Sequence, residues 1–525
     1  MTLRYRFIDL TSIADVSQLL EAARLLPAAG LQGPSKPSLP LHNVFNRLKL
    51  IGARTLLVQD AVRDPDFIAE HQAFYSKQHR PVARTCWRLH AFAVSVPTLT
   101  NPEGSERDVL DFLDALEDRD NVYLGFVTIR PLRHAPVGAS ILVPPKLPEV
   151  TCLEEFPVHI AGKDFRVCGT PYLQQDNAVG ACAQASIWIA LRTQMKRVGN
   201  TAYTPAELTL AATRYMALDR VFPGRQGLVI EQMLEAIRSS GHDPLTLTCK
   251  TDGLDPRPVI AEAMPYIESG LPVIATLFPP GGGHAVVCIG RAFKEGPIEP
   301  KNERLKNFEY QVASDWVDSL VMHNDNTGPY LALASGAADS NDYCLQHARN
   351  LIIPLPETVH MTAREAEQAA LTAVALAGAF LTQFNTTRTP QFVPDTRIVL
   401  RTLLVRRHTL RRWALTDIDI DPVLRDRYRT VELPRLVWFV ELHDAQLFNP
   451  RDPSTKSRVG EVIVDASADS LHGDAALAVH VMQQMYPNHA GEGVPQALAA
   501  FVGIELDVLL LDSAEMGTSM RTPWS

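Results

Sequence analysis

The first 150 residues alternate short apolar runs with amphipathic segments, the pattern of a region that contains both strands and helices. Asp64-Pro65 predicts the N-cap and first turn of a helix, and another helix is expected near 106–116. The runs rich in β-branched and aromatic residues predict strands at 53–60, 83–96 and 121–132. The Pro-, Gly- and Ser-rich stretch 26–40 predicts a linker or long loop. We therefore expect an N-terminal segment with linker over 1–40 and a small α/β domain over 41–150.

The middle third of the chain places helices first and strands afterwards. A Pro-rich connection at 143–150 precedes it. The capping box Thr204-x-x-Glu207 predicts one helix start. Further helices are expected at 182–197, 228–239 and 257–269, and strands at 271–278, 284–290, 308–316 and 319–325. This order predicts an α+β domain over 151–357.

The last third begins after Pro354 and Pro356. Thr362-x-x-Glu365 is a second capping box and predicts the start of a long apolar helix. Apolar runs at 436–443 and 459–467 predict strands. We expect a C-terminal helix and mixed α/β region over 358–525.

Composition narrows the class of protein. The chain has 525 residues, of which 46% are hydrophobic and 21% charged, so several folded domains are expected. The formal net charge of −9 argues against nucleic acid as the main partner, because phosphate binding draws on clustered positive charge. The chain starts without a signal-peptide pattern, and its most apolar helical stretch, 369–381, is too short to span a membrane. We expect a soluble, cytoplasmic protein.

The seven cysteines are sparse, odd in number and never form a C-x-x-C pair, which argues against a disulfide framework or a zinc ribbon. One of them, Cys182, opens a predicted helix, whose N-terminus favours a thiolate. Small residues around it leave room for a substrate carbonyl: Gly180, Ala181, Ala183 and Ala185. Cys182 is therefore a candidate nucleophile, and such chemistry needs no cofactor.

The other members of a catalytic site follow from what a cysteine nucleophile requires. His284 opens a strand directly after three glycines and is a candidate base. Asp325 ends a later predicted strand and can hold the imidazole tautomer. Gln174 or Gln175, seven to eight residues before Cys182, can donate an amide N–H to an oxyanion beside the backbone N–H of the cysteine.

These residues resemble the papain-like cysteine peptidase superfamily, and most closely the bacteriocin-leader processing (double-glycine) peptidases. The matching positions are Gln174 or Gln175, Cys182, Gly283-His284 and Asp325, and the likeness covers about residues 165–335. The resemblance implies a catalytic domain in which the cysteine helix packs on an antiparallel sheet carrying His and Asp. It also implies a protein or peptide substrate. Proteins with such an embedded domain occur in bacterial interference and defence systems.

The chain departs from the family pattern at three points. Ala183 replaces the usual glycine after the cysteine. The usual spacing between glutamine and cysteine is one residue shorter than the spacing here, which leaves Gln174 and Gln175 as alternatives. His284 and Asp325 are 41 positions apart (325 − 284), so Asp315 or Asn324 are alternatives for the residue that orients His284.

The leading hypothesis is a hydrolase that cleaves a peptide or isopeptide bond through a Cys-His-Asp triad and a thioester intermediate. The same triad can transfer the acyl group to an amine, as in transglutaminase-type exchange. A third hypothesis, from a different functional class, is a non-catalytic papain-like adaptor.

Overall fold

The computed structural model describes the chain with the exception of two sets of residues. Neither backbone nor side chain is described for 1–4, 26–37, 78, 80, 101–103, 117–118, 120, 177–181, 215–226, 250–254, 281, 297, 299, 301, 306–307, 337–342, 357–358, 385–397, 417–421, 453, 469–474, 482–483, 488–508, 511–518 and 521–525. The backbone alone is described for 182, 304–305, 308, 375–384, 423, 481, 484–487, 509 and 510.

The chain forms two compact units whose segments are interleaved along the sequence. Unit 1 comprises Met1–Thr248, Pro272–Arg291 and Leu320–Pro354, and unit 2 comprises Cys249–Leu271, Ala292–Ser319 and Leu355–Ser525. The four segments expected from the sequence remain a prediction about how the chain is organised.

The N-terminal part of unit 1 is a five-stranded sheet in the order β1-β2-β3-β4-β5, in which every neighbouring pair is antiparallel. Its strands are β1 Tyr5–Asp9, β2 Thr55–Val62, β3 Cys86–Phe92, β4 Tyr123–Ile129 and β5 Ile141–Leu142. The three predicted strands are confirmed. Because all pairs are antiparallel, the region is α+β and differs from the predicted α/β unit.

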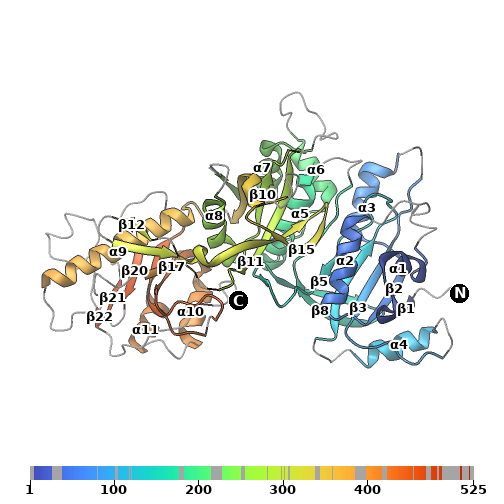
Figure 1. The fold of residues 1–525 in the computed structure, drawn as a ribbon, viewed down its shortest axis with the longest axis horizontal. Coiled ribbons are helices and arrows are strands. Elements are labelled where there is room, and N and C mark those ends of the chain that lie inside the picture. The colour runs from blue at the N-terminus through green and yellow to red at the C-terminus, as the bar shows by residue number, and fades with distance from the viewer. Residues whose placement is uncertain are drawn as a thin grey trace. The chain divides into compact units, whose positions relative to one another are not determined.

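Short helices accompany this sheet (Figure 1): α1 Val16–Ala22, α2 Leu39–Leu50, α3 Pro65–Glu70, a π-helix at His71–Tyr75, and α4 Glu106–Asp114. As predicted, Asp64 caps α3, and its side chain accepts a hydrogen bond from the Phe67 N–H. The apolar side of α2, which includes Val44 and Phe45, packs in one core with Leu56 and Val58 of β2. Helix α2 starts at Leu39, inside the end of the linker predicted over 26–40.

The second sheet, most of it in unit 1, has the strand order β15-β14-β11-β10-β16-β9, with β6 paired to β11. Its strands are β6 Glu149–Val150, β9 His242–Thr248, β10 Val273–Leu277, β11 His284–Phe293, β14 Val317–Asn324, β15 Gly328–Leu333 and β16 Ala348–Pro356. A separate hairpin is formed by β7 Glu154–Ile160 and β8 Lys163–Gly169. The expected α+β class, with antiparallel sheets, is confirmed.

Helices α5 Cys182–Val198, α6 Pro205–Ala212 and α7 Ile230–Ser239 belong to the same part of unit 1. Helix α5 packs on the second sheet: Ala183 and Ile187 share a core with Ile274 of β10 and with Ala285 and Val287 of β11. The predicted capping box is present at α6, where Thr204 and Glu207 satisfy each other's backbone N–H groups.

Unit 2 is built on an eight-stranded sheet in the order β12-β13-β17-β18-β19-β20-β21-β22. The strands are β12 Glu303–Leu305, β13 Phe308–Val312, β17 Ile398–Arg406, β18 Leu436–Asp444, β19 Arg458–Asp465, β20 Ala476–Val481, β21 Gln484–Pro487 and β22 Leu509–Leu510, and the helices are α8 Arg257–Glu268, α9 Ala363–Phe384, α10 Arg407–Thr416 and α11 Pro422–Thr430. The strand predicted over 308–316 was too long. It ends at Val312, and Ala313–Trp316 form a 3₁₀ turn that contains Ser314 and Asp315, residue types that favour turns.

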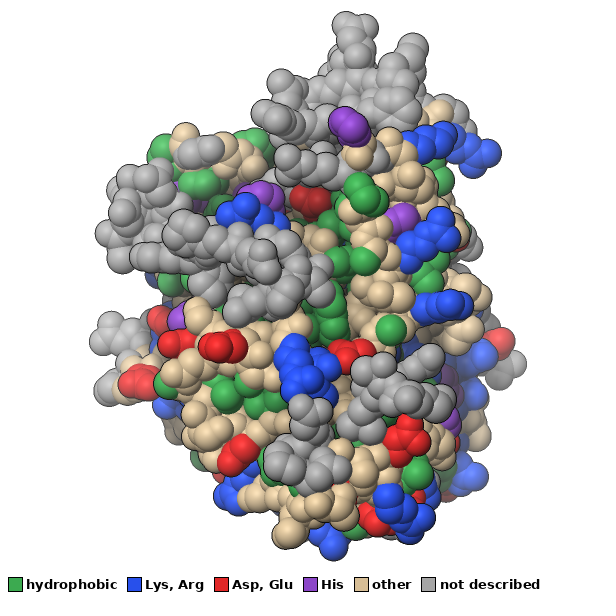
Figure 2. Space-filling model, turned by 90° about the vertical axis from the view of Figure 1, so that its right-hand side faces the viewer, with side chains coloured by type: hydrophobic (Ala, Val, Ile, Leu, Met, Phe, Trp, Pro, Cys, Tyr) green, Lys and Arg blue, Asp and Glu red, His purple; other side chains and the backbone are tan. Residues whose placement is uncertain are grey.

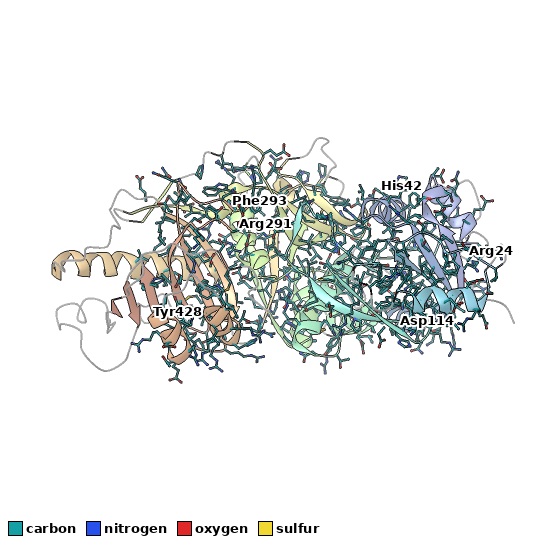
Figure 3. All side chains as sticks on the ribbon, turned by 90° about the horizontal axis from the view of Figure 1, so that it is seen from below. Arg24, His42, Asp114, Arg291, Phe293 and Tyr428 are labelled. Carbon is teal, nitrogen blue, oxygen red and sulfur yellow. The ribbon has the colours of Figure 1, made fainter. Side chains whose placement is uncertain are left out.

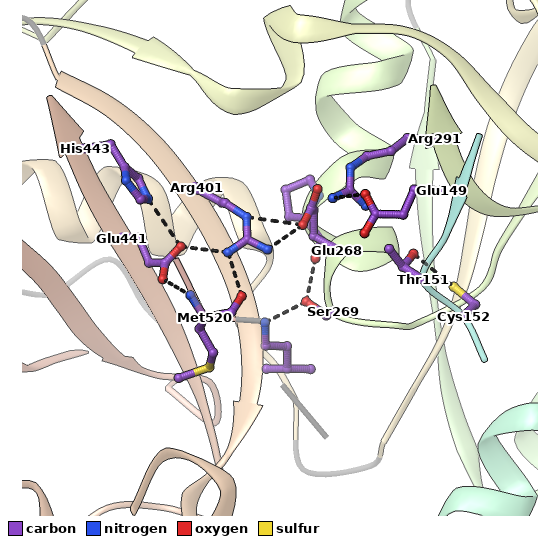
Figure 4. Close-up of polar contacts among 12 residues, drawn as sticks. Glu149, Thr151, Cys152, Glu268, Ser269, Arg291, Arg401, Glu441, His443 and Met520 are labelled. Carbon is purple, nitrogen blue, oxygen red and sulfur yellow. Dashed lines mark hydrogen bonds and ion pairs between the residues drawn. The ribbon is translucent and has the colours of Figure 1, made fainter. Parts of the chain in front are cut away.

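A row of titratable side chains, of which the two glutamates are buried, crosses the sheet of unit 2. Arg401, Glu441, Glu461 and His480 occupy directly opposite positions on successive strands β17 to β20. Arg401 bonds Glu441 and Glu268, each at 2.7 Å (Figure 4), and His480 Nδ1 lies 2.8 Å from Glu461. Tyr428 of α11, labelled in Figure 3, donates its hydroxyl to Glu461. Each buried carboxylate therefore has charged or polar partners, which suits a structural role in this sheet.

Candidate functional site

His284 is the first residue of β11, directly opposite Leu277 of β10, and its side chain is almost fully buried. Its Nε2 atom lies 2.9 Å from Oδ1 of Asn324 and 3.3 Å from Oδ1 of Asp325. The start of β11 and the end of β14 therefore meet, as expected for antiparallel neighbours. The structure thus brings together three of the residues considered from the sequence.

The contacts of Asn324 assign the imidazole tautomer. Asn324 Oδ1 also accepts the backbone N–H of Asn326 at 2.9 Å, so this atom of the amide is the acceptor. His284 Nε2 must then carry a hydrogen and donate it. In the neutral ring Nδ1 is consequently left with a lone pair, which is what a base for a thiol needs.

Two further side chains border the ring of His284. Asn326 Nδ2 lies 3.4 Å from Nδ1, and the ring of Tyr343 lies 4.5 Å from the imidazole, centroid to centroid, at an angle of 34°. Asn326 Nδ2 is also 3.4 Å from the Tyr343 hydroxyl. These neighbours restrict rotation of the imidazole ring, in addition to the hydrogen bond between His284 and Asn324.

Burial sets the protonation of this pair. Burial lowers the pKa of His284 to about 4, although the hydrogen bond to Asn324 works in the opposite direction. Burial raises the pKa of Asp325 to about 8, against the lowering effect of backbone hydrogen bonds. Near neutral pH both side chains are therefore predominantly uncharged.

In a regular strand Asn324 and Asp325 would point to opposite faces, so that only one of them could reach His284. The structure differs because β14 ends at Asn324 and its pairing with β15 shifts register between Met322 and Asn324. Asp325 lies in the turn that follows, where alternation no longer applies. The alternative candidate Asp315 lies before the opposite end of β14, where its backbone carbonyl accepts a hydrogen bond from Lys294.

The two glutamines have different environments. Gln174 is buried, its Oε1 accepts the Val137 N–H at 3.1 Å, and its Nε2 donates to the His134 carbonyl at 3.3 Å. Both polar atoms of its side-chain amide are therefore already hydrogen-bonded to nearby backbone groups. Gln175 is half-buried, and its Oε1 has no hydrogen-bond partner among the described residues. Of the two, Gln175 is the one without a described structural role.

Cys182 is the first residue of α5, as predicted, and its side chain lies outside the described residues. The helix itself is anchored beside His284. Ser186 Oγ donates a 2.9 Å hydrogen bond to the carbonyl of Ala285, the residue that follows His284. Positions 182 and 186 are one helical turn apart on the same face of α5. The first turn of α5 therefore lies against the start of β11.

Several residues that contact the site were not predicted from the sequence. Tyr172 donates its hydroxyl to the Asn324 carbonyl at 3.2 Å and links the glutamine segment to the turn after β14. Arg130 is buried and donates to the carbonyls of Ala135 and Gln174 and to Glu70. The sequence signal available for Arg130 was a charge at the end of an apolar strand run, and the signal for Tyr172 was its position two residues before Gln174. Nothing near Tyr343 in the sequence pointed to this site.

Within the described part of the chain, no group of three or more His, Cys, Asp or Glu side chains has a geometry that could hold a metal ion. Among the described residues there is also no helix with the length and apolar character needed to cross a membrane. On the face drawn in Figure 2, acidic and basic side chains are interspersed.

Comparison with protein-family models found no match, and comparison with curated proteins found none either. Comparison with solved structures found a partial similarity to UfSP from C. elegans, with 12% sequence identity and a TM-score of 0.22. The similar region covers 40% of this chain and 35% of the UfSP chain. A similarity at this level establishes neither a shared fold nor a shared activity.

Proposed function

We propose that the chain is a papain-like cysteine hydrolase that cleaves a peptide or isopeptide bond, with Cys182 as nucleophile and His284 as base. The observation that carries the proposal is the hydrogen bond from Ser186 to the carbonyl of Ala285. It ties the first turn of α5, which begins at Cys182, to the residue next to His284. Support also comes from the tautomer of His284, since its unprotonated nitrogen is the one that Asn324 and Asp325 leave unused.

The reaction would proceed in two steps, acylation of Cys182 and hydrolysis of the resulting thioester. His284 Nδ1 takes the thiol proton, and the Cys182 sulfur attacks the substrate carbonyl to form a tetrahedral intermediate. The amide N–H of Gln175 and the backbone N–H of Cys182 stabilise its oxyanion. Collapse of the intermediate expels the amine, which takes the proton from His284, and leaves a thioester. Water then attacks the thioester carbonyl with His284 again as base. The C–S bond breaks, the carboxylic acid product is released, and the Cys182 thiolate takes back the proton from His284.

Asn324 and Asp325 would divide the task of orienting His284. The Asn324 amide oxygen fixes the tautomer, being the nearer partner at 2.9 Å. Asp325 at 3.3 Å can ionise when His284 becomes protonated, because an imidazolium beside it favours the carboxylate. The triad Cys182-His284-Asp325 expected from the sequence is thus proposed with Asn324 as an additional member.

The test is labelling of the full-length chain with a thiol-directed, activity-based peptidyl probe. Wild-type protein should be labelled on Cys182, and both Cys182→Ala and His284→Ala should lose this label while keeping the wild-type melting temperature. Labelling that persists in folded Cys182→Ala would assign the reactive thiol to another cysteine and overturn the proposal.

A further inference from the structure

Two helices of the N-terminal region contact the segments on either side of the proposed site. Helix α2 reaches the turn after Asp325: Asn43 Nδ2 donates to the Thr327 carbonyl at 2.7 Å, and Arg47 Nη2 donates to the Tyr330 carbonyl at 2.6 Å. Gly328 lies between these two acceptors with φ +142°, and a Cβ atom there would come within 2.8 Å of Asn43 Cβ. The close approach of α2 to this turn therefore depends on the glycine.

The π-helix at His71–Tyr75 contacts the other side, the segment that leads to Cys182. The buried hydroxyl of Tyr75 donates to Asp176 Oδ2 at 2.7 Å. Two residues earlier, Arg130 donates to the backbone carbonyl of Gln174 and is held by Glu70, the last residue of α3, at 2.8 Å. Residues 174–176 are thus fixed at both ends by groups from the N-terminal sheet and its helices. π-Helices are rare and often found at functional positions.

Helix α3 also holds the cysteine helix directly. Asp66 Oδ1 accepts the indole N–H of Trp188 at 3.2 Å, and its Oδ2 accepts from Arg192 at 3.3 Å. All three residues lie at the α3–α5 contact, where Asp66 and Trp188 are buried. The same short helical segment, 65–75, therefore contacts both helix α5 and the residues that precede the first turn of α5.

We propose that the N-terminal region is a structural part of the active site, with Tyr75 and Asn43 as positioning residues for Cys182 and for the turn that orients His284. The inference rests on the proposed function. A hydrogen bond between neutral groups contributes about 1 kcal/mol to stability, and one to a charged group about 1.5–3 kcal/mol, so removing either one should leave the fold intact. A displacement of about 1 Å in reacting groups can lower a rate by about a hundredfold, so reactivity should respond more than stability.

The experiment compares Tyr75→Phe and Asn43→Ala with Tyr203→Phe in the full-length chain. Tyr203 is a matched control, because it also lies in unit 1 and donates one hydroxyl hydrogen bond, to the Ser239 carbonyl at 2.8 Å. Two quantities are measured: the melting temperature, and the rate of Cys182 alkylation by iodoacetamide from pH 5 to 9. Cys168, which is exposed, serves as an internal reference thiol.

We expect Tyr75→Phe and Asn43→Ala each to slow Cys182 alkylation at pH 7 by about threefold to tenfold and to move its pH profile upward. Melting temperatures should match that of Tyr203→Phe, whose alkylation profile stays at the wild-type position. Wild-type profiles in both variants, or an equal shift in Tyr203→Phe, would overturn the positioning role while leaving the proposed function standing. If wild-type Cys182 reacts no faster than Cys168, the proposed function itself fails and the positioning role fails with it.

Discussion

The substitution Asp325→Asn should make the protein more stable, and increasingly so as the pH rises. Burial raises the pKa of Asp325 to about 8 in the folded chain, against about 3.9 for an unfolded aspartate. Above pH 4 the unfolded state releases a proton that the folded state keeps, so the stability contributed by this group falls as pH rises through 8. An asparagine side chain has a similar shape and does not ionise, so this pH dependence would disappear in the variant.

The size of the effect follows from the two pKa values. Between pH 6.5 and 8 the free energy of unfolding of the wild type should fall by about 1.7 kcal/mol more than that of Asp325→Asn. This window is chosen because the pKa of His284, lowered to about 4 by burial, lies well below it. The stability that neutral His284 contributes is lost only as pH falls from about 6.5 towards 4, so it is nearly constant within the window.

The assay is urea unfolding of both proteins at pH 6.5, 7.25 and 8. The difference between them, rather than either curve alone, isolates Asp325, because all other titrating groups are shared. Parallel curves would show that Asp325 has an ordinary pKa and is ionised in the folded state. His284 would then have an ionised carboxylate, and not a neutral carboxyl group, beside it at pH 7.

Two further changes test the fold and the site. Asn324→Ala should lower turnover and the rate of Cys182 alkylation by about a hundredfold, because His284 loses the acceptor that fixes its tautomer. Asn324→Asp keeps an acceptor oxygen and should retain more of both rates. Equal rates in the two variants would argue against this role of Asn324. Thr362→Ala should lower the free energy of unfolding by about 1 kcal/mol, since the Thr362 side chain accepts the Glu365 N–H at the start of α9, and an unchanged melting curve would contradict this.

Local signals in the sequence were sufficient for elements whose boundaries depend on a few neighbouring residues. The capping boxes at Thr204 and Thr362 lie where they were predicted, because each is complete within four residues. The strand that begins with His284 was also predicted correctly, since glycines break the chain before it and an apolar run follows.

The rest depended on contacts between distant segments. Whether Asn324 or Asp325 reaches His284 depends on where β14 ends and on its register shift against β15, and neither is encoded in the local alternation of residues. The interaction of Asn43 with Thr327 joins positions 284 apart, and that of Tyr75 with Asp176 joins positions 101 apart. The sequence therefore indicated His284, Asn324 and Asp325, which the structure brings together, but could not reveal the helices that contact the segments around them.

Alkylation kinetics determine whether Cys182 is a nucleophile activated by His284. Full-length wild type and His284→Ala are treated with limiting iodoacetamide at pH 6.5, and the modified cysteines are mapped by mass spectrometry. Cys168 is the reference, because the residue is exposed to the reagent. Local desolvation and the neighbouring Glu154 and Glu155 raise the pKa of its thiol, so these surroundings do not activate it. We predict that Cys182 is modified first in the wild type and at least tenfold more slowly in folded His284→Ala. If Cys182 is modified no faster than Cys168, or at the same rate in both proteins, His284 does not activate Cys182.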